Sequence, residues 1–569
     1  MQGVEMSLWS RLQRLWKSPE PSTPQGSLTG PEVLLEHSNV FEKGVFPVTK
    51  GVWVAIGYGL ANVVILEGDE GVVLVDSLGS RESAEEVKEA ITAVVNKPVH
   101  ALILTHNHTD HIFGGGVLAP DPDIPVVAHE TTSALIDKIV SRLRPIITRR
   151  SMRQFGNYLQ GSSDFVNSGI GPFLDAGPGK TLALRRPTQT LQDKEVLEYP
   201  GMRLQLLHAP GETDDQLVIW WPEKRVLVGA DNFYKAFPNL YAIRGTAHRD
   251  VMQWVASLDT MRSLRPAFLV PCHTRPVVGE ELIFETLTCY RDAIQYVHDQ
   301  TVRWMNKGLT PDEIVEKVRL PEHLRSKPYL QELYGSVDWS VRSVFQGYLG
   351  WFDGNPTHLH PLPPQQKAER LVRLAGGIEA FREQTRQAVQ EKEWQWVLEL
   401  TDSLLCLDKE DSEARGWRIQ ALRGRGLQES SANGRNYYLT RAREWEGLDI
   451  PLMNQATPEL LQSLPLSAFF GAMASNLNPE SAAELDVCVG FRFSDVGEEF
   501  TVHLRHGIAE IQERFPENPA LTVTVDSQIW KEVVARLRTP AVAFAQGLLD
   551  VEGGRLLFVR VMQCFEQPA

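Results

Sequence analysis

The stretch LILTHNHTDHIFGGG, residues 102–116, decides how the chain is interpreted. Its opening LILT is apolar and β-branched, which predicts a buried strand. Three histidines and an aspartate follow at once, and imidazole and carboxylate are ligand types that Zn²⁺ accepts. His106 and His108 can point at one ion, whereas Asp110 and His111 suit a second ion beside it. The stretch therefore predicts a pair of metal ions at the end of a strand.

The composition narrows the possible functions. The chain has 569 residues and a net charge of −15, which argues against a large nucleic-acid-binding surface. An anionic substrate remains possible, because a local site can be positive on an acidic protein. The five cysteines are far apart and form neither a disulfide framework nor a CxxC zinc site. No stretch reaches the ~20 apolar residues of a membrane span, so we expect a soluble protein without stable membrane insertion.

The N-terminal segment lacks the apolar central run of a secretory signal, so we expect a cytoplasmic protein. Leu8, Leu12, Leu15 and Trp16 share one helical face with basic residues among them. This pattern favours a short helix docked on the body, or a frayed tail, over a membrane-surface helix.

The periodicity of the sequence divides it into four parts. After an N-terminal arm (1–44), residues 45–285 alternate strands and helices twice, which predicts two packed sheets covered by helices on both sides, an αββα sandwich. Residues 286–450 have apolar side chains at helical spacing with breaks near Glu391 and Asp408, which predicts an all-α domain of antiparallel hairpins. Residues 451–569 alternate strands with helices, and 548–562 is interpreted as strand, so we expect a small α+β domain with an antiparallel sheet.

The H-x-H-x-D-H order at a strand end resembles the metallo-β-lactamase superfamily. In that superfamily the remaining ligands follow later strands. Glu212 in LLHAPGETDD stands where a histidine usually follows Pro-Gly, Asp231 in VLVGADN matches the bridging acid, and His273 in FLVPCHTRP matches the last histidine. Singly, Glu212 could be a turn acid and Asp231 a helix cap. Together and in order they are a strong match.

The Pro-Gly-Glu variation resembles the alkyl sulfatases of this superfamily, as do the runs at 57–78, 239–250, 347–357 and 523–533. The resemblance covers nearly the whole chain. It implies a metallohydrolase domain, a helical dimerisation domain and a C-terminal domain similar to sterol carrier protein 2. It also implies two Zn²⁺ per chain, one held by His106, His108 and Glu212 and the other by Asp110, His111 and His273, with Asp231 and a hydroxide bridging them.

Two positions depart from the alkyl-sulfatase pattern. The bridging acid is typically Glu, and here it is Asp231, whose shorter reach could shift the metals. In YGSVDWSVRSVF, Trp339 stands near a histidine that is thought to act on the sulfate ester in well-known members. The second departure leaves the protonation of the leaving group, and so the substrate, open.

Charge balance predicts a separate anion-binding residue. Two Zn²⁺ are neutralised by three carboxylates and a hydroxide, so a sulfate ester needs a further cation, for which Arg244 is the candidate. Tyr241 and Asn62 are expected to donate further hydrogen bonds. Asp110 and Asp231 are expected to be catalytic through the metals, and His248 is a possible proton donor to the alcohol. The ordinary alternatives are a salt bridge for Arg244 and a solvated helix start for His248.

Three functions remain after this reasoning. The first is a binuclear zinc alkyl sulfatase that acts on a small anionic amphiphile as a homodimer, with metal-activated hydroxide as nucleophile. The second is the same metallohydrolase acting on an aryl sulfate, a phosphodiester or a lactone, which Trp339 favours. The third is a lipid-binding or scaffolding protein with a vestigial metal site, which the presence of competent residues at all seven ligand positions disfavours.

Overall fold

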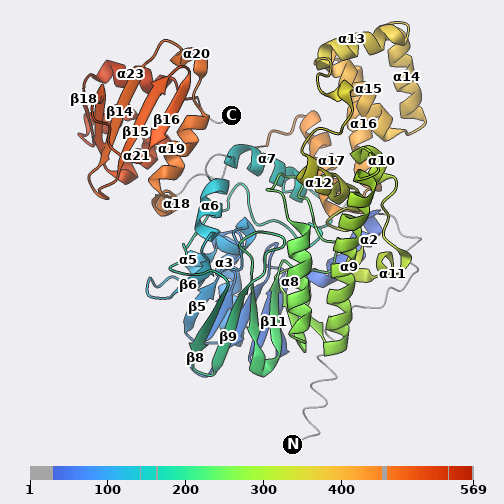
Figure 1. Ribbon diagram of the computed structural model, residues 1–569, viewed down its shortest axis with the longest axis vertical. Coiled ribbons are helices and arrows are strands. Elements are labelled where there is room, and N and C mark those ends of the chain that lie inside the picture. The colour runs from blue at the N-terminus through green and yellow to red at the C-terminus, as the bar shows by residue number, and fades with distance from the viewer. Residues whose placement is uncertain (1–29, 141–142, 162–163, 451–457, 536, 567–569) are drawn as a thin grey trace, which may run out of the picture. The chain divides into compact units, whose positions relative to one another are not determined.

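The computed structural model describes residues 30–140, 143–161, 164–450, 458–535 and 537–566 (Figure 1). The helix expected over residues 8–16 lies outside them. The chain forms two compact units. The first comprises Met1–Glu130, Arg149–Lys180 and Pro187–Pro451, and the second comprises Thr131–Thr148, Thr181–Arg186 and Leu452–Ala569.

The first unit contains a seven-stranded sheet in sequential order. Its first four strands form an antiparallel meander, and the remaining strands continue in parallel. The strands are β1 (Gly44–Thr49), β2 (Val52–Ile56), β3 (Val63–Glu67), β4 (Val72–Val75), β5 (Val99–Ile103), β6 (Val126–His129) and β7 (Gln189–Leu191).

A six-stranded sheet in the order β13-β12-β11-β10-β9-β8 packs against the first. Only its β11–β12 pair is parallel among the pairings described. The strands are β8 (Lys194–Tyr199), β9 (Met202–His208), β10 (Leu217–Trp221), β11 (Val226–Ala230), β12 (Phe268–Pro271) and β13 (Val277–Val278).

The position of strand β10 explains why its sequence is apolar throughout. Leu217, Ile219 and Trp221 belong to the core between the sheets, whereas Val218 and Trp220 join the core under the helices. Successive side chains of a strand point to opposite faces, so a strand covered on both faces must be apolar at every position.

Helices cover both outer faces of the sandwich, which confirms the predicted αββα arrangement (Figure 1). Helices α8 (Val251–Ser263) and α9 (Glu280–Met305) pack on the six-stranded sheet. Helix α3 (Arg81–Val94) packs against α5 (Gly115–Leu118) and β1. Two shorter helices complete this part of the chain: α2 (Gly30–His37) precedes β1, and α4 (Thr109–Ile112) follows β5.

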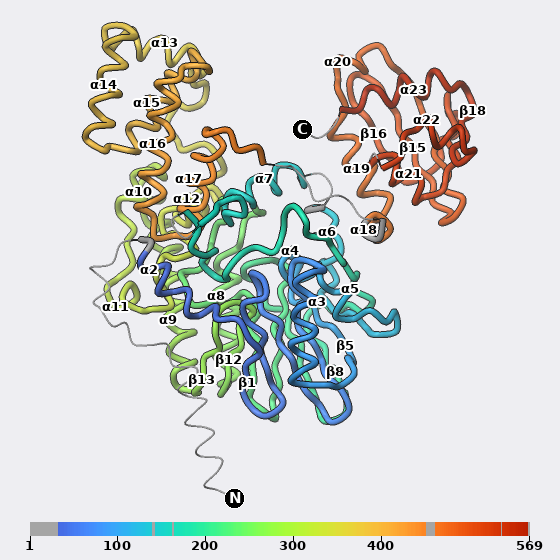
Figure 2. Tube along the Cα trace, turned by 180° about the vertical axis from the view of Figure 1, so that it is seen from behind, coloured from blue at the N-terminus to red at the C-terminus, as the bar shows by residue number. Residues whose placement is uncertain are grey.

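The region after α9 is helical, as predicted (Figure 2). The predicted breaks near Glu391 and Asp408 are confirmed as interhelical turns, while the expected domain boundary at 285–286 falls inside α9. The helices are α10 (Pro311–Val315), α11 (Glu322–Arg325), α12 (Val337–Leu349), α13 (Pro364–Leu374), α14 (Ile378–Gln390), α15 (Trp394–Leu407), α16 (Ser412–Gln428) and α17 (Ala432–Trp445).

The second unit is built on a five-stranded sheet in the order β16-β15-β14-β17-β18. Its strands are β14 (Val487–Phe493), β15 (Glu499–Arg505), β16 (Ile508–Gln512), β17 (Leu521–Val525) and β18 (Leu549–Glu552). Its helices are α6 (Thr132–Val140), α18 (Pro458–Ser463), α19 (Leu466–Ser475), α20 (Pro479–Ala482), α21 (Ser527–Val534), α22 (Pro540–Ala545) and α23 (Arg555–Gln563), while α7 (Arg144–Phe155) has residues in both units.

Two details of this unit correct the sequence interpretation. The sheet is not wholly antiparallel, because β14 and β17 pair in parallel. The predicted strand over 548–562 ends at Glu552, where Gly553 and Gly554 take positive φ, and the rest forms α23. Phe558 and Val561, three residues apart, are the buried side chains of that helix. A short apolar run fits either period, and the glycine pair decides between them.

Among the described residues, no helix is both long and apolar enough to cross a bilayer.

Candidate metal centre

The seven predicted ligands come together at one edge of the sandwich, at the carboxyl ends of strands from both sheets. Four follow β5, and the others follow β9, β11 and β12. Six are buried and His108 is partly exposed. The donor atoms group into two sets, each with its atoms within 4.8 Å of one another.

The first position is defined by His106, His108 and Glu212. The His106 Nε2 and His108 Nδ1 atoms are 2.9 Å apart, and His108 Nδ1 lies 3.6 Å from Glu212 Oε2. A tetrahedral ion with bonds of ~2.0–2.1 Å separates its ligands by about 3.3 Å. The spacing of these donors therefore suits one ion.

The second position is defined by Asp110, His111 and His273. Asp110 Oδ2 lies 3.4 Å from His111 Nε2 and 3.6 Å from His273 Nε2. This set is more enclosed, since both imidazoles have no exposed surface. The separations of these donors are close to those expected around one tetrahedral ion, so this set suits a second ion.

Asp231 lies between the two positions. Its Oδ2 is 3.6 Å from His106 Nε2, 3.5 Å from His111 Nε2 and 3.1 Å from His273 Nε2. Its Oδ1 has no hydrogen-bond partner among the described residues, and neither have Glu212 Oε2 and His111 Nε2, although all are buried. Buried polar atoms without partners are costly, and a cation would satisfy all three.

A hydrogen-bonded chain behind the ligands links the two positions. The hydroxyl of Thr105 lies 2.9 Å from His106 Nδ1 and donates to Asp76 Oδ2 at 2.9 Å, while the same carboxylate is 2.7 Å from His111 Nδ1. Both imidazoles thus have Nδ1 engaged and Nε2 turned towards the cluster, as ligands require. Asp76 holds this place with φ of +63°, an uncommon conformation for a residue other than glycine.

Asn62 supports His273 instead of facing open space. Its Nδ2 donates to the carbonyls of Thr274 at 2.8 Å and Pro271 at 3.2 Å, and so clamps the loop that carries His273. His273 Nδ1 lies 2.8 Å from the carbonyl of Leu60. Both amide hydrogens of Asn62 are therefore used, which favours a positioning role over the predicted contact with substrate.

The two positions differ electrostatically. At the first, burial and the nearby charges of His111 and His108 hold the pKa of His106 well below its usual range. At the second, burial lowers the pKa of His111 and His273, but the surrounding carboxylates outweigh it and raise both pKa values. The first position thus contains a neutral imidazole, whereas the second attracts protons.

Arg249 is a buried cation that the sequence reasoning missed. Its Nη1 donates to Glu212 Oε1 at 2.9 Å and to the carbonyl of Asn239, and its side chain is 2 % exposed. This ion pair holds the pKa of Glu212 well below its usual range, although burial acts the other way. Arg249 Nε and Nη2 and both amide atoms of Asn239 are buried without hydrogen-bond partners among the described residues. These groups suit an anionic ligand.

Tyr334 is a second residue that the sequence reasoning missed. It is buried, and burial together with the carboxylate of Glu212 raises its pKa, while Arg244 acts in the opposite direction. A phenol under these influences stays protonated and can donate a hydrogen bond. Its only sequence signal is its place at the start of YGSVDWSVRSVF.

The remaining predicted residues have different surroundings. Arg244 Nη2 lies 3.1 Å from His108 Nε2, beside the first position. Tyr241, which precedes Arg244 by three residues, is partly buried. His248 is exposed, and its ring packs against Gly347 on α12. Trp339 is partly buried and lies against Gly434 on α17. The described contacts bring Arg244 to the donors but not His248 or Trp339.

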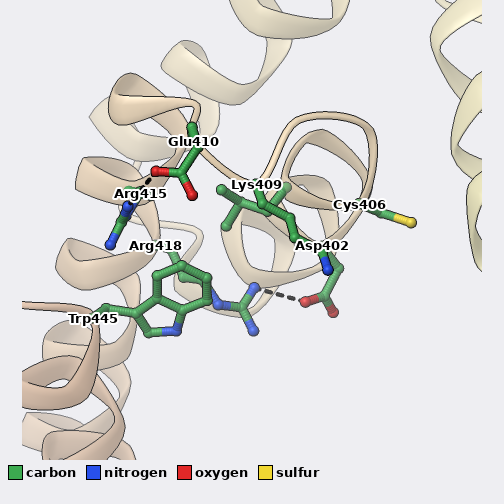
Figure 3. Close-up of a pocket in the computed structure, with 8 residues that line it drawn as sticks. Asp402, Cys406, Lys409, Glu410, Arg415, Arg418 and Trp445 are labelled. Carbon is green, nitrogen blue, oxygen red and sulfur yellow. Dashed lines mark hydrogen bonds and ion pairs between the residues drawn. The ribbon is translucent and has the colours of Figure 1, made fainter. Parts of the chain in front are cut away.

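Two hollows lie in the helical region, away from the metal donors. One, of about 430 Å³, is drawn in Figure 3. Its two arginines are already engaged, since Arg418 pairs with Asp402 at 2.7 Å and Arg415 with Glu410 at 3.3 Å, both beside the ring of Trp445. The other, of about 590 Å³, has a mainly apolar lining from α13, α14 and α15. Neither combines the donors that hydrolysis requires.

Comparison with family models divides the chain into three matched ranges. Residues 56–273 match the metallo-beta-lactamase superfamily, residues 310–447 match alkyl sulfatase dimerisation, and residues 454–569 match the alkyl sulfatase C-terminal family. The first range includes all seven donors. The second range includes all the residues that line the two hollows.

Characterised relatives match over most of the chain. A linear primary-alkylsulfatase of Pseudomonas sp. (strain ATCC 19151) is 35 % identical over 88 % of this chain and 98 % of its own length. An alkyl/aryl-sulfatase of Saccharomyces cerevisiae is 28 % identical over 96 % of this chain and 86 % of its own. The solved structure of the stereoselective inverting sec-alkylsulfatase Pisa1 from Pseudomonas sp. superimposes with a TM-score of 0.88 at 26 % identity, covering 95 % of this chain and 87 % of that one.

Proposed function

Because the chain belongs to the alkyl sulfatases of the metallo-β-lactamase superfamily, we propose that it hydrolyses linear alkyl sulfate esters at a centre of two zinc ions. It is a sulfuric ester hydrolase with a divalent metal cofactor. The observation that carries the proposal is the convergence of seven donors, six of them buried, in two sets, with an arginine against one of them. The products are the alcohol and inorganic sulfate.

Each of the two positions suits zinc. Imidazole nitrogen and carboxylate oxygen are its usual ligands, and the donor spacings match tetrahedral geometry. His106, His108 and Glu212 would hold one ion, Asp110, His111 and His273 the other, and Asp231 would contact both. Bound zinc lowers the pKa of water to about 7 and so supplies a nucleophile at neutral pH.

Arg244 is the proposed clamp for the sulfate group. Its Nη2 donates to His108 Nε2. An ion held by His108 Nδ1 would leave the ring proton on Nε2, which would then not accept this hydrogen bond. The guanidinium of Arg244 would be available to an anion beside the first position. Its planar fork matches the oxygens of a sulfate ester.

Arg249 and Asn239 extend this anion site. Three ligand carboxylates nearly neutralise two divalent ions once a hydroxide is counted, so the added charge of Arg244 and Arg249 makes the site attractive to a monoanion. Arg249 is committed through Nη1 to Glu212, and its Nε and Nη2 remain for the substrate. The free amide of Asn239 adds a neutral donor.

An alkoxide is a poor leaving group, so the departing alcohol oxygen needs to receive a proton. His248 remains a proposed donor, although its ring lies against Gly347. Tyr334 is the better placed candidate, because it is buried and within electrostatic reach of Glu212 and Arg244. Loss of activity in Tyr334→Phe with retention in His248→Ala would assign the role to Tyr334, and the reverse pattern would assign it to His248.

The proposed assembly is a homodimer through the helical region. This region matches a dimerisation family, and its larger hollow is bordered by the exposed side chains Leu371, Leu374 and Trp396. A second copy would cover them. A Leu374→Glu variant that sediments as a monomer while the wild type sediments as a dimer would support this surface, and an unchanged dimer would exclude it.

Sulfate release from dodecyl sulfate, measured with and without a metal chelator, tests the function directly. We expect release that the chelator abolishes and that added Zn²⁺ restores, and we expect His106→Ala to be inactive. p-Nitrophenyl sulfate and a phosphodiester serve as competing substrates, because Trp339 and the yeast alkyl/aryl-sulfatase relative favour testing aryl esters. Hydrolysis of the aryl ester alone would replace the proposed substrate, and a metal content clearly below about two ions per chain would contradict the two-ion centre.

A further inference from the structure

The first position depends on two loops that come from different sheets. His106 and His108 follow β5 of the seven-stranded sheet, whereas Glu212 lies between β9 and β10 of the six-stranded sheet. One ion accepts all three only if their donors stay about 3 Å apart. Whatever joins the two loops therefore sets the geometry of this position.

A buried side-chain hydrogen bond joins them. Asn107, between the two histidines, donates through Nδ2 to Asp215 Oδ1 at 2.7 Å. Asp215 follows Glu212 by three residues and is fully buried, and Asn107 is 5 % exposed. The backbone N–H of Leu217 donates to the carbonyl of Thr105 at 2.8 Å alongside. The two loops are thus joined within one residue of two ligands and three residues of the other.

Other bonds of the Glu212 loop serve a different purpose. Asn232 donates to the carbonyl of Ala209 at 2.8 Å, and the hydroxyl of Ser257 donates to the carbonyl of Pro210 at 2.7 Å. These bonds hold the loop to β11 and α8 on its own side of the sandwich. The Asn107–Asp215 bond instead crosses to the opposite sheet, and its carboxylate acceptor makes it stronger than a neutral bond.

A stacked histidine pair borders the same acid. The rings of His129 and His208 are 4.0 Å apart with an interplanar angle of 18°. Parallel rings direct their nitrogen lone pairs into parallel planes, so this pair does not chelate a metal. Burial and His208 lower the pKa of His129, and Asp215 partly opposes them. The surroundings of Asp215 therefore support an anchoring role and not a third metal site.

We propose that Asn107 and Asp215 are positioning residues that hold Glu212 at ligating distance from His106 and His108, and thereby set the metal affinity of the first position. This inference rests on the two-ion centre proposed above. It assigns no ligand role to either residue, because their bond directs Asn107 Nδ2 to Asp215.

Zinc titration of the full-length, metal-stripped protein against a competing chelator tests the inference without any substrate. For Asp215→Ala we expect one of the two binding events to weaken by roughly tenfold to a hundredfold, the range for residues that orient metal ligands, with the other unchanged. Asp214→Ala is the matched control, since it removes the same charge from the exposed neighbouring residue. We expect its two affinities to equal those of the wild type.

Conservative variants separate positioning from folding. Asp215→Asn can still accept a hydrogen bond through its amide oxygen, so we expect a loss smaller than that of Asp215→Ala. The exchanged pair Asn107→Asp with Asp215→Asn keeps one donor, one acceptor and the net charge, and we expect it to regain affinity relative to Asn107→Ala. A merely structural defect would weaken both binding events and would not be relieved by the exchange.

The outcomes distinguish this inference from the proposed function. Wild-type protein that binds no metal would overturn the two-ion centre itself. Wild-type protein that binds two ions, with Asp215→Ala retaining both affinities, would overturn only the positioning role. Equal weakening of both positions in Asp215→Ala, with no recovery in the exchanged pair, would also overturn it.

Discussion

The first and second metal positions use similar donors but are built differently. The second takes Asp110 and His111 from one helical turn and adds His273, whose imidazole has no exposed surface. The first also takes ligands from both sheets, but it includes a partly exposed His108 and has an arginine against Glu212. An enclosed site favours tight, stable binding, whereas the more exposed site lies beside Arg244, the proposed anion clamp.

Removing the ligand that the positions share should have the largest effect. Asp231 Oδ2 lies within 3.6 Å of donors from both sets. We expect Asp231→Ala to reduce kcat on dodecyl sulfate by on the order of a thousandfold or more, since the ions supply several kcal/mol and each ~1.4 kcal/mol is tenfold. Metal analysis should show weaker binding at both positions. If one position kept its full metal affinity, Asp231 would be a ligand of the other position only.

The pH dependence of metal binding should distinguish the positions next. His111 and His273 have raised pKa values in the metal-free protein, so an ion at the second position displaces up to two protons, whereas His106 is already neutral. Below those pKa values, the affinity of the second position should fall by up to about a hundredfold per pH unit, and that of the first more gently. Above them the extra dependence should disappear. Chelator competition at pH values on either side of neutrality measures both slopes, and equal slopes would contradict the assignment.

The same shifts fix the sign of the effect on folding. Because the folded-state pKa values of His111 and His273 are raised, their contribution to the stability of the metal-free protein is present at low pH and is lost as pH rises through those values. Metal-free protein should therefore lose this contribution over the range in which metal binding at the second position strengthens.

The sequence predicted the clustering of the donors better than their surroundings. Residues 106–111 are close in sequence, so a strand followed by H-x-H-x-D-H was enough to predict that they cluster, whereas Glu212, Asp231 and His273 were placed beside them by resemblance. The buried ion pair of Arg249 was missed, while His248 beside it was chosen. Nothing in the local pattern distinguishes a buried arginine from an exposed histidine one residue away, because their burial depends on α12 and on the Glu212 loop.

The fold was predictable where periodicity and length agreed. The β10 run is apolar on both faces and too short for a helix, and it is a buried strand. The failure over α23 arose where those signals were ambiguous, and backbone conformation at Gly553 and Gly554 decided the outcome. Hydrogen bonds such as Asn107–Asp215 join residues 108 positions apart and leave no periodic trace.

Removing Arg244, the proposed anion clamp, should have a smaller effect that is confined to the first position. We expect Arg244→Ala to raise KM for dodecyl sulfate by roughly tenfold to a hundredfold, the equivalent of ~1.5–3 kcal/mol for hydrogen bonds to a charged group. Metal content should stay unchanged, because the side chain of Arg244 contacts Nε2 of His108 and not Nδ1, the nitrogen proposed to bind the ion. Arg244→Lys keeps the charge but not the planar fork and should recover only part of the loss. An unchanged KM in Arg244→Ala would exclude the clamp.

The smallest expected effect concerns the chain of hydrogen bonds that connects the two positions. Thr105 is the link, since its hydroxyl contacts His106 Nδ1 and donates to the carboxylate of Asp76 that also orients His111. Thr105→Val keeps the shape and removes the hydroxyl, so His106 loses its outer partner while Asp76 retains the backbone N–H of residue 105 and His111. We expect the first position to lose roughly tenfold in zinc affinity, the low end for such partners, with the second within a fewfold of wild type. Equal losses of zinc affinity at both positions would show that the hydrogen bonds of Thr105 and Asp76 support the whole centre together. The two positions would then differ in exposure alone.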